Sequence, residues 1–141
     1  MQTFLPYSDY AKSMSVLDNE RLGNQVYREG NTLLNGGWKN HPAYKMWKGF
    51  ERSLAHYCLR GAQEMCNRKG TKGSWTDEVC ITWITYFQDQ INKLPETGDP
   101  PWIGREAIHA SHRSKLLFKN FKHYSKFGWK ESMDLPYVWP V

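Results

Sequence analysis

The sequence predicts an all-α fold, a compact single domain over residues 1–141 with three main helices. Apolar residues recur at three- and four-residue steps through most of the chain, which is the spacing of an amphipathic helix. No stretch alternates polar and apolar residues with the period of two that is typical of a strand. Breaks rich in glycine and proline divide the chain into helix-sized segments. An extended N-terminal arm and an aromatic, basic C-terminal tail are expected to flank the helices.

The arm and two of the main helices are expected in the first half of the chain. The arm covers residues 1–14, and a first helix begins near Ser15, because Ser15 and Asp18 resemble a capping box. This helix ends at a pair of glycines. A second helix starts at Pro42, because proline is favoured in the first helical turn, and it continues to Gly70.

The second half of the chain is expected to hold a third main helix and a shorter fourth. Ser74, with Asp77 three residues later, is expected to cap the third helix. Residues 94–102 contain three prolines and therefore cannot be helical. The fourth helix is expected over about residues 105–119, and the tail follows it.

Composition and charge narrow the classes of function. The chain has 19 Lys and Arg against 14 Asp and Glu, and the resulting net charge of +5 favours a polyanionic partner such as nucleic acid. Aromatic residues make up 15% of the chain, enough to build the core or to form stacking surfaces. No apolar run approaches the ~20 residues that a membrane-spanning helix needs. Three cysteines are too few for a disulfide framework, so we expect a cytoplasmic protein. We also expect a monomer.

Two basic groups are candidates for nucleic-acid binding. The segment 105–122 interleaves cations and histidines with hydroxyls and rings, which suits phosphate contacts and base stacking, although a solvated helix face has the same composition. A second group lies at the start of the second helix, where free backbone amides can bind phosphate or a capping turn can form. The candidate residues are Lys39, Asn40, His41, Arg105, His109, His112, Arg113, Lys115 and Lys119.

The spacing of Glu106, His109 and His112 also allows a metal site. These residues follow one another at three-residue steps, so they lie loosely on one helical face, and His41 could add a fourth ligand. A metal-dependent hydrolase is therefore one alternative function. The pattern lacks a second ligand pair such as HExxH, so hydrogen bonds to serines or phosphates explain the histidines better, and we expect no metal or other cofactor.

Polar residues line one side of the expected first helix. Asp18, Arg21, Gln25 and Arg28 follow at steps of three, four and three residues. Such a face can bind a nucleotide, or it can form ion pairs within the helix. The spacing alone leaves both interpretations open.

Four separated segments occur in an order that resembles a known family. They are MQTFLPYSDYAKS at the start, LDNERLGNQ at 17–25, WKNHPAYKMWKGFE at 38–51 and HASHRSKLL at 109–117. Along nearly its whole length the chain resembles the pyrimidine-dimer DNA glycosylase (endonuclease V-like) family, and most closely an uncharacterised bacterial and phage branch of it.

The resemblance implies a compact helical enzyme without a cofactor that repairs or processes DNA. Such enzymes flip a nucleotide and attack sugar C1′ with the N-terminal α-amine. The Schiff base that results expels a damaged or modified pyrimidine, and β-elimination then nicks the strand, which is AP lyase activity. The chemistry is reasonable, because an α-amino group ordinarily titrates near ~8 and is more often neutral at pH 7 than a lysine is.

The resemblance also implies roles for individual residues. Counting back from Arg21 without a gap makes Met1 the nucleophile, and the bulky Gln2 favours its retention. In this register the catalytic glutamate of the family falls on Arg21, so the nearby carboxylates become the candidates for acid-base support. The implied set is Asp18 and Glu20 for acid-base support; Arg21, Gln25 and His41 around the flipped nucleotide; Lys115 and Lys119 on phosphates; and Tyr124 among the aromatic tail contacts. A non-catalytic protein that binds nucleic acid or a nucleotide on the same scaffold is the alternative.

Overall fold

A computed structural model describes residues 1–140 and contains no strand among them, so the predicted all-α class is confirmed. The elements are α1 Tyr10–Val16, α2 Asn19–Asn24, η1 Gln25–Gly30, α3 Asn31–Leu34, α4 Pro42–Lys45, α5 Glu51–Asn67, α6 Asp77–Lys93, α7 Glu106–Lys119, α8 Phe121–Tyr124 and η2 Ser125–Phe127. A π-helical turn, η1, directly continues α2, and a short 3-10 helix, η2, directly follows α8.

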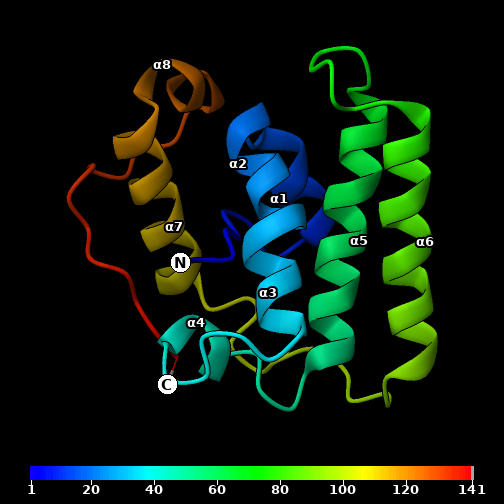
Figure 1. The fold of residues 1–141 in the computed structure, drawn as a ribbon. Helices are drawn as coiled ribbons and strands as arrows, with labels where there is room; N and C mark the ends of the chain where they lie inside the picture. The colour runs from blue at the N-terminus through cyan, green and yellow to red at the C-terminus, as the bar shows by residue number, and fades with distance from the viewer. Residues whose placement is uncertain (141) are drawn as a thin grey trace.

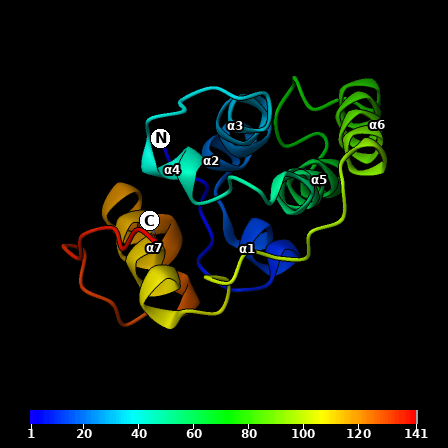
Figure 2. The same cartoon turned by 90° about the horizontal axis from the view of Figure 1, so that it is seen from below.

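The helices form two groups with the N-terminal arm between them. Figure 1 shows α5 and α6 antiparallel and side by side, with α1, α2 and α3 next to α5 and with α7 on the opposite side of the molecule. Viewed from below, the arm runs between α7 and the group formed by α1 and α2 (Figure 2). Phe4 and Leu5 of the arm are buried in the hydrophobic core together with Trp47 and Tyr57. The start of the chain is therefore part of the interior.

The expected arm and first helix differ from those in the structure. Residues 1–14 were expected to be extended, but α1 begins at Tyr10, because the Asp9 carboxylate accepts a hydrogen bond from the Lys12 N–H and caps a turn that buries Met14. The chain then bends at Leu17, whose backbone is extended. The predicted capping box is wrong, since Ser15 lies in the last turn of α1 and the Asp18 side chain caps no backbone amide.

The expected second helix is divided into α4 and α5. It begins at Pro42 as predicted, but Gly49 has a φ of +88°, a left-handed conformation that an α-helix cannot contain. α5 then begins at Glu51 and ends before Gly70. Apolar spacing continues across the break, and for this reason the spacing did not reveal it.

The second half of the chain agrees better with the prediction. The break at 94–102 is confirmed, and α7 covers 106–119. The cap of the third helix is Thr76, which accepts from the Val79 N–H at 3.2 Å, and not Ser74. In the part of the chain described, every helix is too short or too polar to cross a membrane.

Candidate active site at the start of the chain

Buried side chains from the helical group around α5 hold one side of the N-terminal arm. The Phe4 N–H donates to Gln25 Oε1 at 2.9 Å, and the Tyr57 hydroxyl donates to the Phe4 carbonyl at 2.8 Å. The Trp47 indole N–H donates to Thr3 Oγ1 at 2.9 Å. Because buried backbone groups are costly when unpaired, this network fixes the path of the arm.

Buried side chains of α7 hold the other side. The Leu5 N–H donates to His112 Nδ1 at 2.9 Å, and the Leu5 carbonyl lies 2.8 Å from His109 Nδ1. His109 Nε2 accepts from the Gly104 N–H, so His109 Nδ1 carries the proton and donates to Leu5. Arg113 Nη1 donates to the Pro6 carbonyl at 2.7 Å.

These contacts place three predicted phosphate-binding residues in the interior. His109, His112 and Arg113 are only 2%, 0% and 8% exposed, and their polar atoms bind the arm. Burial, with His109 and Arg113 nearby, lowers the pKa of His112 to about 3, so its ring is neutral and can accept from the backbone. The three residues therefore lie where they position the arm, away from the surface that a phosphate could reach.

The alternative metal site does not form, for the same reason. His109 and His112 bind the arm, while Glu106 pairs with Arg113 at the start of α7. Within residues 1–140, no three His, Cys, Asp or Glu side chains come together as a set that could hold a metal. The alternative function, a metal-dependent hydrolase, therefore has no ligand set among these residues.

The arm leads to a pocket of about 160 Å³ at Met1. The N-terminal arm, α2, the π-turn, the end of α7 and the C-terminal tail all contribute. The lining residues are Met1, Gln2, Phe4, Arg21, Asn24, Gln25, Glu29, Lys119 and Tyr137.

Glu29 is the pocket carboxylate, and the sequence analysis missed it. It lies half-buried in η1, one residue before Gly30. A Cβ on Gly30 would come within 2.5 Å of both Cys58 Sγ and the Gln25 carbonyl, so glycine allows the π-turn to pack against α5. A π-turn holds an extra residue compared with an α-helical turn, so counting along an uninterrupted helix misplaces the residues around it. The available signal was the spacing of Glu29 four residues after Gln25, which puts them on one face.

The two predicted carboxylates do not line this pocket. Asp18 is engaged elsewhere, because it accepts from the Tyr124 hydroxyl and pairs with Arg21 Nη1 at 3.2 Å. Burial and this hydrogen bond raise the pKa of the Tyr124 hydroxyl, which lies in the core beneath Asp18. Glu20 is exposed to solvent. Arg21 is thus the residue of this group that reaches the pocket, held in place by Asp18.

Aromatic side chains extend from the pocket toward α4. The ring of Tyr137 in the pocket lies 5.3 Å from that of Trp139, which meets the His41 ring edge-on at 5.7 Å. On its other side, His41 meets Trp38, an exposed ring. His41 Nδ1 caps α4 by accepting from the Ala43 N–H, so the predicted capping turn is present. Burial and the N-terminal ammonium group lower the pKa of His41, because the start of the chain is nearby.

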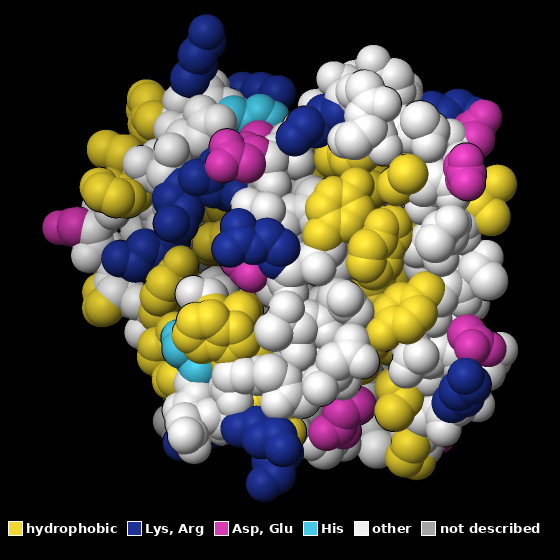
Figure 3. Space-filling view, in the orientation of Figure 1, with side chains coloured by type: hydrophobic (Ala, Val, Ile, Leu, Met, Phe, Trp, Pro, Cys, Tyr) yellow, Lys and Arg dark blue, Asp and Glu magenta, His cyan; other side chains and the backbone are white. Residues whose placement is uncertain are grey.

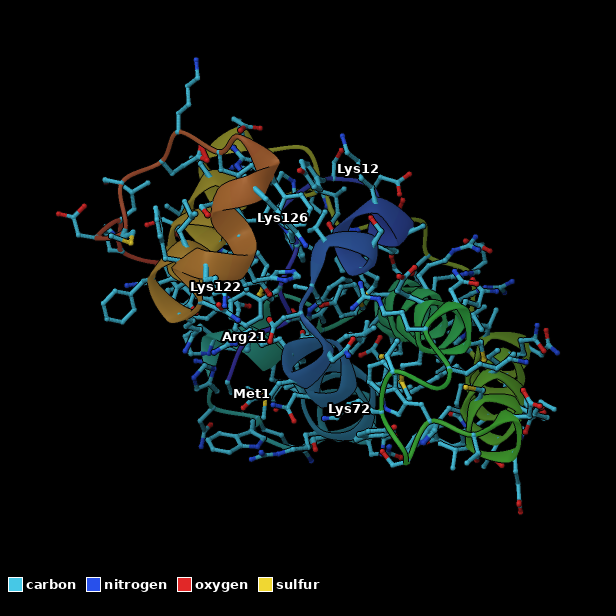
Figure 4. All side chains as sticks on the ribbon, turned by 90° about the horizontal axis from the view of Figure 1, so that it is seen from above. Met1, Lys12, Arg21, Lys72, Lys122 and Lys126 are labelled. Carbon is cyan, nitrogen blue, oxygen red and sulfur yellow. The ribbon has the colours of Figure 1, made fainter. Side chains whose placement is uncertain are left out.

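Cations surround the pocket on the side of α7. Lys119 lines it, and Lys115 Nζ lies 5.4 Å from the centre of the Tyr137 ring. Figure 3 shows Lys and Arg side chains gathered mainly over the left half of this face, the side of α7, with hydrophobic side chains among them. In Figure 4, Met1 and Arg21 lie on the side of α2 that faces α7, with Lys122 across from them. Of the other predicted cations, Arg105 is exposed at the residue before α7, and Lys39 is exposed in the turn before α4. The neighbouring Asn40 is exposed in the same turn.

Comparison with known proteins gives one match. The model of a family described as pyrimidine dimer DNA glycosylase matches residues 1–77, which is more than half of the 141 residues. The matched segment includes the arm, the π-turn and α5, and therefore most of the residues that line the pocket. Searches of curated proteins and of solved structures find no match.

Proposed function

Because the chain belongs to the pyrimidine dimer DNA glycosylase family, we propose that it removes a damaged or modified pyrimidine from DNA through attack by the α-amine of Met1. The family is one of DNA repair enzymes, and the attack on sugar C1′, the AP lyase step and the roles of individual residues are our proposal. The observation that carries it is the pocket that Met1 and Glu29 both line, at the end of an arm held by buried hydrogen bonds. We also propose that it acts as a monomer.

The proposed reaction uses the amine as nucleophile and the carboxylate as base. The neutral α-amine forms a bond to C1′ while the bond from C1′ to the base breaks, and Glu29 accepts the proton that the amine loses. The sugar ring then opens as the C1′–O4′ bond breaks, and O4′ takes up the second proton of the amine, which leaves an imine between C1′ and Met1. Removal of a C2′ proton expels the 3′ phosphate and nicks the strand.

Rings and cations around the pocket support DNA as the substrate. Tyr137, Trp139 and Trp38 offer faces on which bases can stack, while Arg21 and Lys119 can bind phosphates. A nucleotide inside a duplex cannot bring C1′ to an amine in a pocket, so the proposed attack requires the nucleotide to flip out first. The small pocket then receives the sugar, and the rings contact its neighbours.

Borohydride trapping on an abasic site tests the proposal without a choice of lesion. Untagged protein, whose intact mass shows that the chain begins with Met1, is incubated with a duplex that contains one abasic site, and borohydride is added. We expect a covalent protein–DNA adduct that is lost when a short extension precedes Met1 and is kept when the same extension follows Val141.

Two outcomes would contradict the proposal. An adduct that survives the N-terminal extension would exclude Met1 as the nucleophile. Salt-sensitive binding without any adduct would favour the alternative of a DNA-binding protein that lacks catalysis.

A further inference from the structure

An unpaired hydrogen-bond donor lies in the wall of the pocket. Gln2 is 4% exposed and lines the cavity next to Met1. Its Oε1 accepts from the Thr3 N–H at 2.9 Å, which fixes which end of the amide is oxygen and which is nitrogen. Its Nε2 is buried and has no hydrogen-bond partner. Buried polar atoms are rarely left unpaired, so this donor needs an acceptor, and a molecule bound in the pocket that Gln2 lines can supply one.

The position of Gln2 narrows the choice of acceptor. Gln2 is bonded to Met1, so a substrate whose C1′ reaches the α-amine brings the atoms around its glycosidic bond toward this amide. In a pyrimidine nucleotide, C1′ is bonded to N1, and the carbonyl oxygen O2 is on the ring carbon next to N1. O2 is therefore the acceptor on the base that lies nearest to the reacting carbon.

We propose that the Gln2 side-chain amide donates a hydrogen bond to O2 of the departing pyrimidine and stabilises it as a leaving group. The inference rests on the proposed function. As the amine forms its bond to C1′ and the C1′–N1 bond breaks, the electron pair of that bond stays on the base and spreads from N1 onto O2. The proton that the amine gives up, held by Glu29, is the one that finally neutralises the base. A donor aimed at O2 binds this charge more strongly than it binds the intact nucleotide, which is the condition for catalysis.

The contribution of this hydrogen bond depends on whether the C5–C6 bond of the base is saturated. In an ordinary pyrimidine, the C5=C6 double bond also carries charge from N1 to the substituent at C4. Saturation of C5 and C6, as in a cyclobutane dimer or a dihydropyrimidine, removes that route and leaves O2 as the conjugated oxygen. The Gln2 amide therefore contributes most where the base cannot spread its charge by itself.

Gln2→Met and Gln2→Glu test the inference when base release and abasic-site trapping are compared for each protein. Both variants remove the donor and keep the side-chain length, and Gln2→Glu also keeps an acceptor for the Thr3 N–H. On a duplex with a 5,6-saturated pyrimidine, we expect single-turnover base release to fall about 100-fold, the usual effect of losing one such donor. Adduct formation on an abasic site, where no base leaves, should stay within about twofold of wild type.

Thr3→Val is the matched control, because it removes another hydrogen bond of the arm, the one from Trp47, at a residue that does not line the pocket. It should change both reactions by the same factor. Equal losses of both reactions in the Gln2 variants, or no loss in either, would overturn the inference and leave the proposed function intact. Absence of an adduct with the wild-type protein would instead remove the proposed function and this inference with it.

Discussion

The two ends of the chain reach the same pocket by different means. The N-terminal arm passes through the interior, where buried side chains such as Gln25 and His112 pair with its backbone. The C-terminal tail runs along the surface of α7, where two serines hold it: the Leu135 N–H donates to Ser114 Oγ at 3.1 Å and the Val138 N–H to Ser111 Oγ at 3.2 Å. Figure 1 shows the tail passing outside α7 to end beside α4.

The difference indicates that the two ends of the chain have different roles, the arm in the chemical step and the tail in binding. A nucleophile must stay within a fraction of an ångström of its productive position, and a buried arm with paired backbone groups provides this. Half-buried rings on a surface tail can instead adjust to the shape of a bent or opened duplex. We therefore expect changes at the arm to affect the chemical step or the stability, and changes at the tail to affect binding.

The largest effect is expected at Glu29, the carboxylate that lines the pocket together with Met1. Glu29→Gln keeps the shape of the side chain and removes its ability to accept a proton, so base release should fall by about 100- to 1,000-fold. Single-turnover kinetics measures the loss, and the Kd for the same duplex should change little. Glu20→Gln, an exposed carboxylate outside the pocket, is the control and should have wild-type rates. A similar loss in both variants would indicate a general effect of charge on DNA binding.

The sequence predicted the helical class and the ends of α7, because local spacing and prolines determine them. It also led to Arg21 and Lys119, which the structure brings to the pocket with Met1. Burial separates residues that look alike in the sequence: Lys119 and His112 belong to one basic segment, yet only Lys119 reaches solvent. Which residues of α7 are buried depends on the segment that packs against it. That segment is the arm, which lies more than 100 residues away along the chain.

The position of Glu29 could not be derived from helical spacing alone. It depends on the π-turn, which forms where Gly30 packs closely against α5. No local signal for a π-turn is as clear as a proline or a glycine pair. Asp18 and Glu20 were chosen instead because they lie beside Arg21, where the ungapped register places the glutamate of the family.

A smaller effect is expected from the loss of one anchor of the arm. Gln25→Leu removes the acceptor for the Phe4 N–H and leaves this group buried, while the Tyr57 hydroxyl keeps the Phe4 carbonyl as its acceptor. The free energy of unfolding should fall by about 1–3 kcal/mol, the cost of one unpaired buried group. Urea denaturation measures this. Gln88→Leu, an exposed position of α6, should change the stability by less than about 0.5 kcal/mol. Equal stabilities of the two variants would show that the arm is not anchored at Gln25.

The arm should also make stability depend on pH. The pKa of His112 is lowered from 6.5 to about 3 by burial, so below pH 6.5 the unfolded chain binds a proton that the folded chain does not. The free energy of unfolding should therefore fall as the pH falls from 6.5 toward 3, by up to about 1.4 kcal/mol per pH unit from this group, and should not change above pH 7 through it. His112→Gln cannot titrate, so its urea midpoints should lose this part of the slope. An unchanged slope in the variant would mean that His112 is accessible to protons in the folded state.

The smallest effect is expected at the tail, and here binding and chemistry should separate. Trp139→Ala removes a ring that packs against Tyr137 and His41 beside the pocket. Stacking of one base on an aromatic side chain contributes about 1–3 kcal/mol, so KM for a lesion-containing duplex should rise about 10-fold while kcat stays close to wild type. Met133→Ala, an exposed tail residue that does not line the pocket, should change neither. A fall in kcat as large as the rise in KM would show that Trp139, like the residues that hold the arm, affects the chemical step. The two ends of the chain would then not differ in the way proposed.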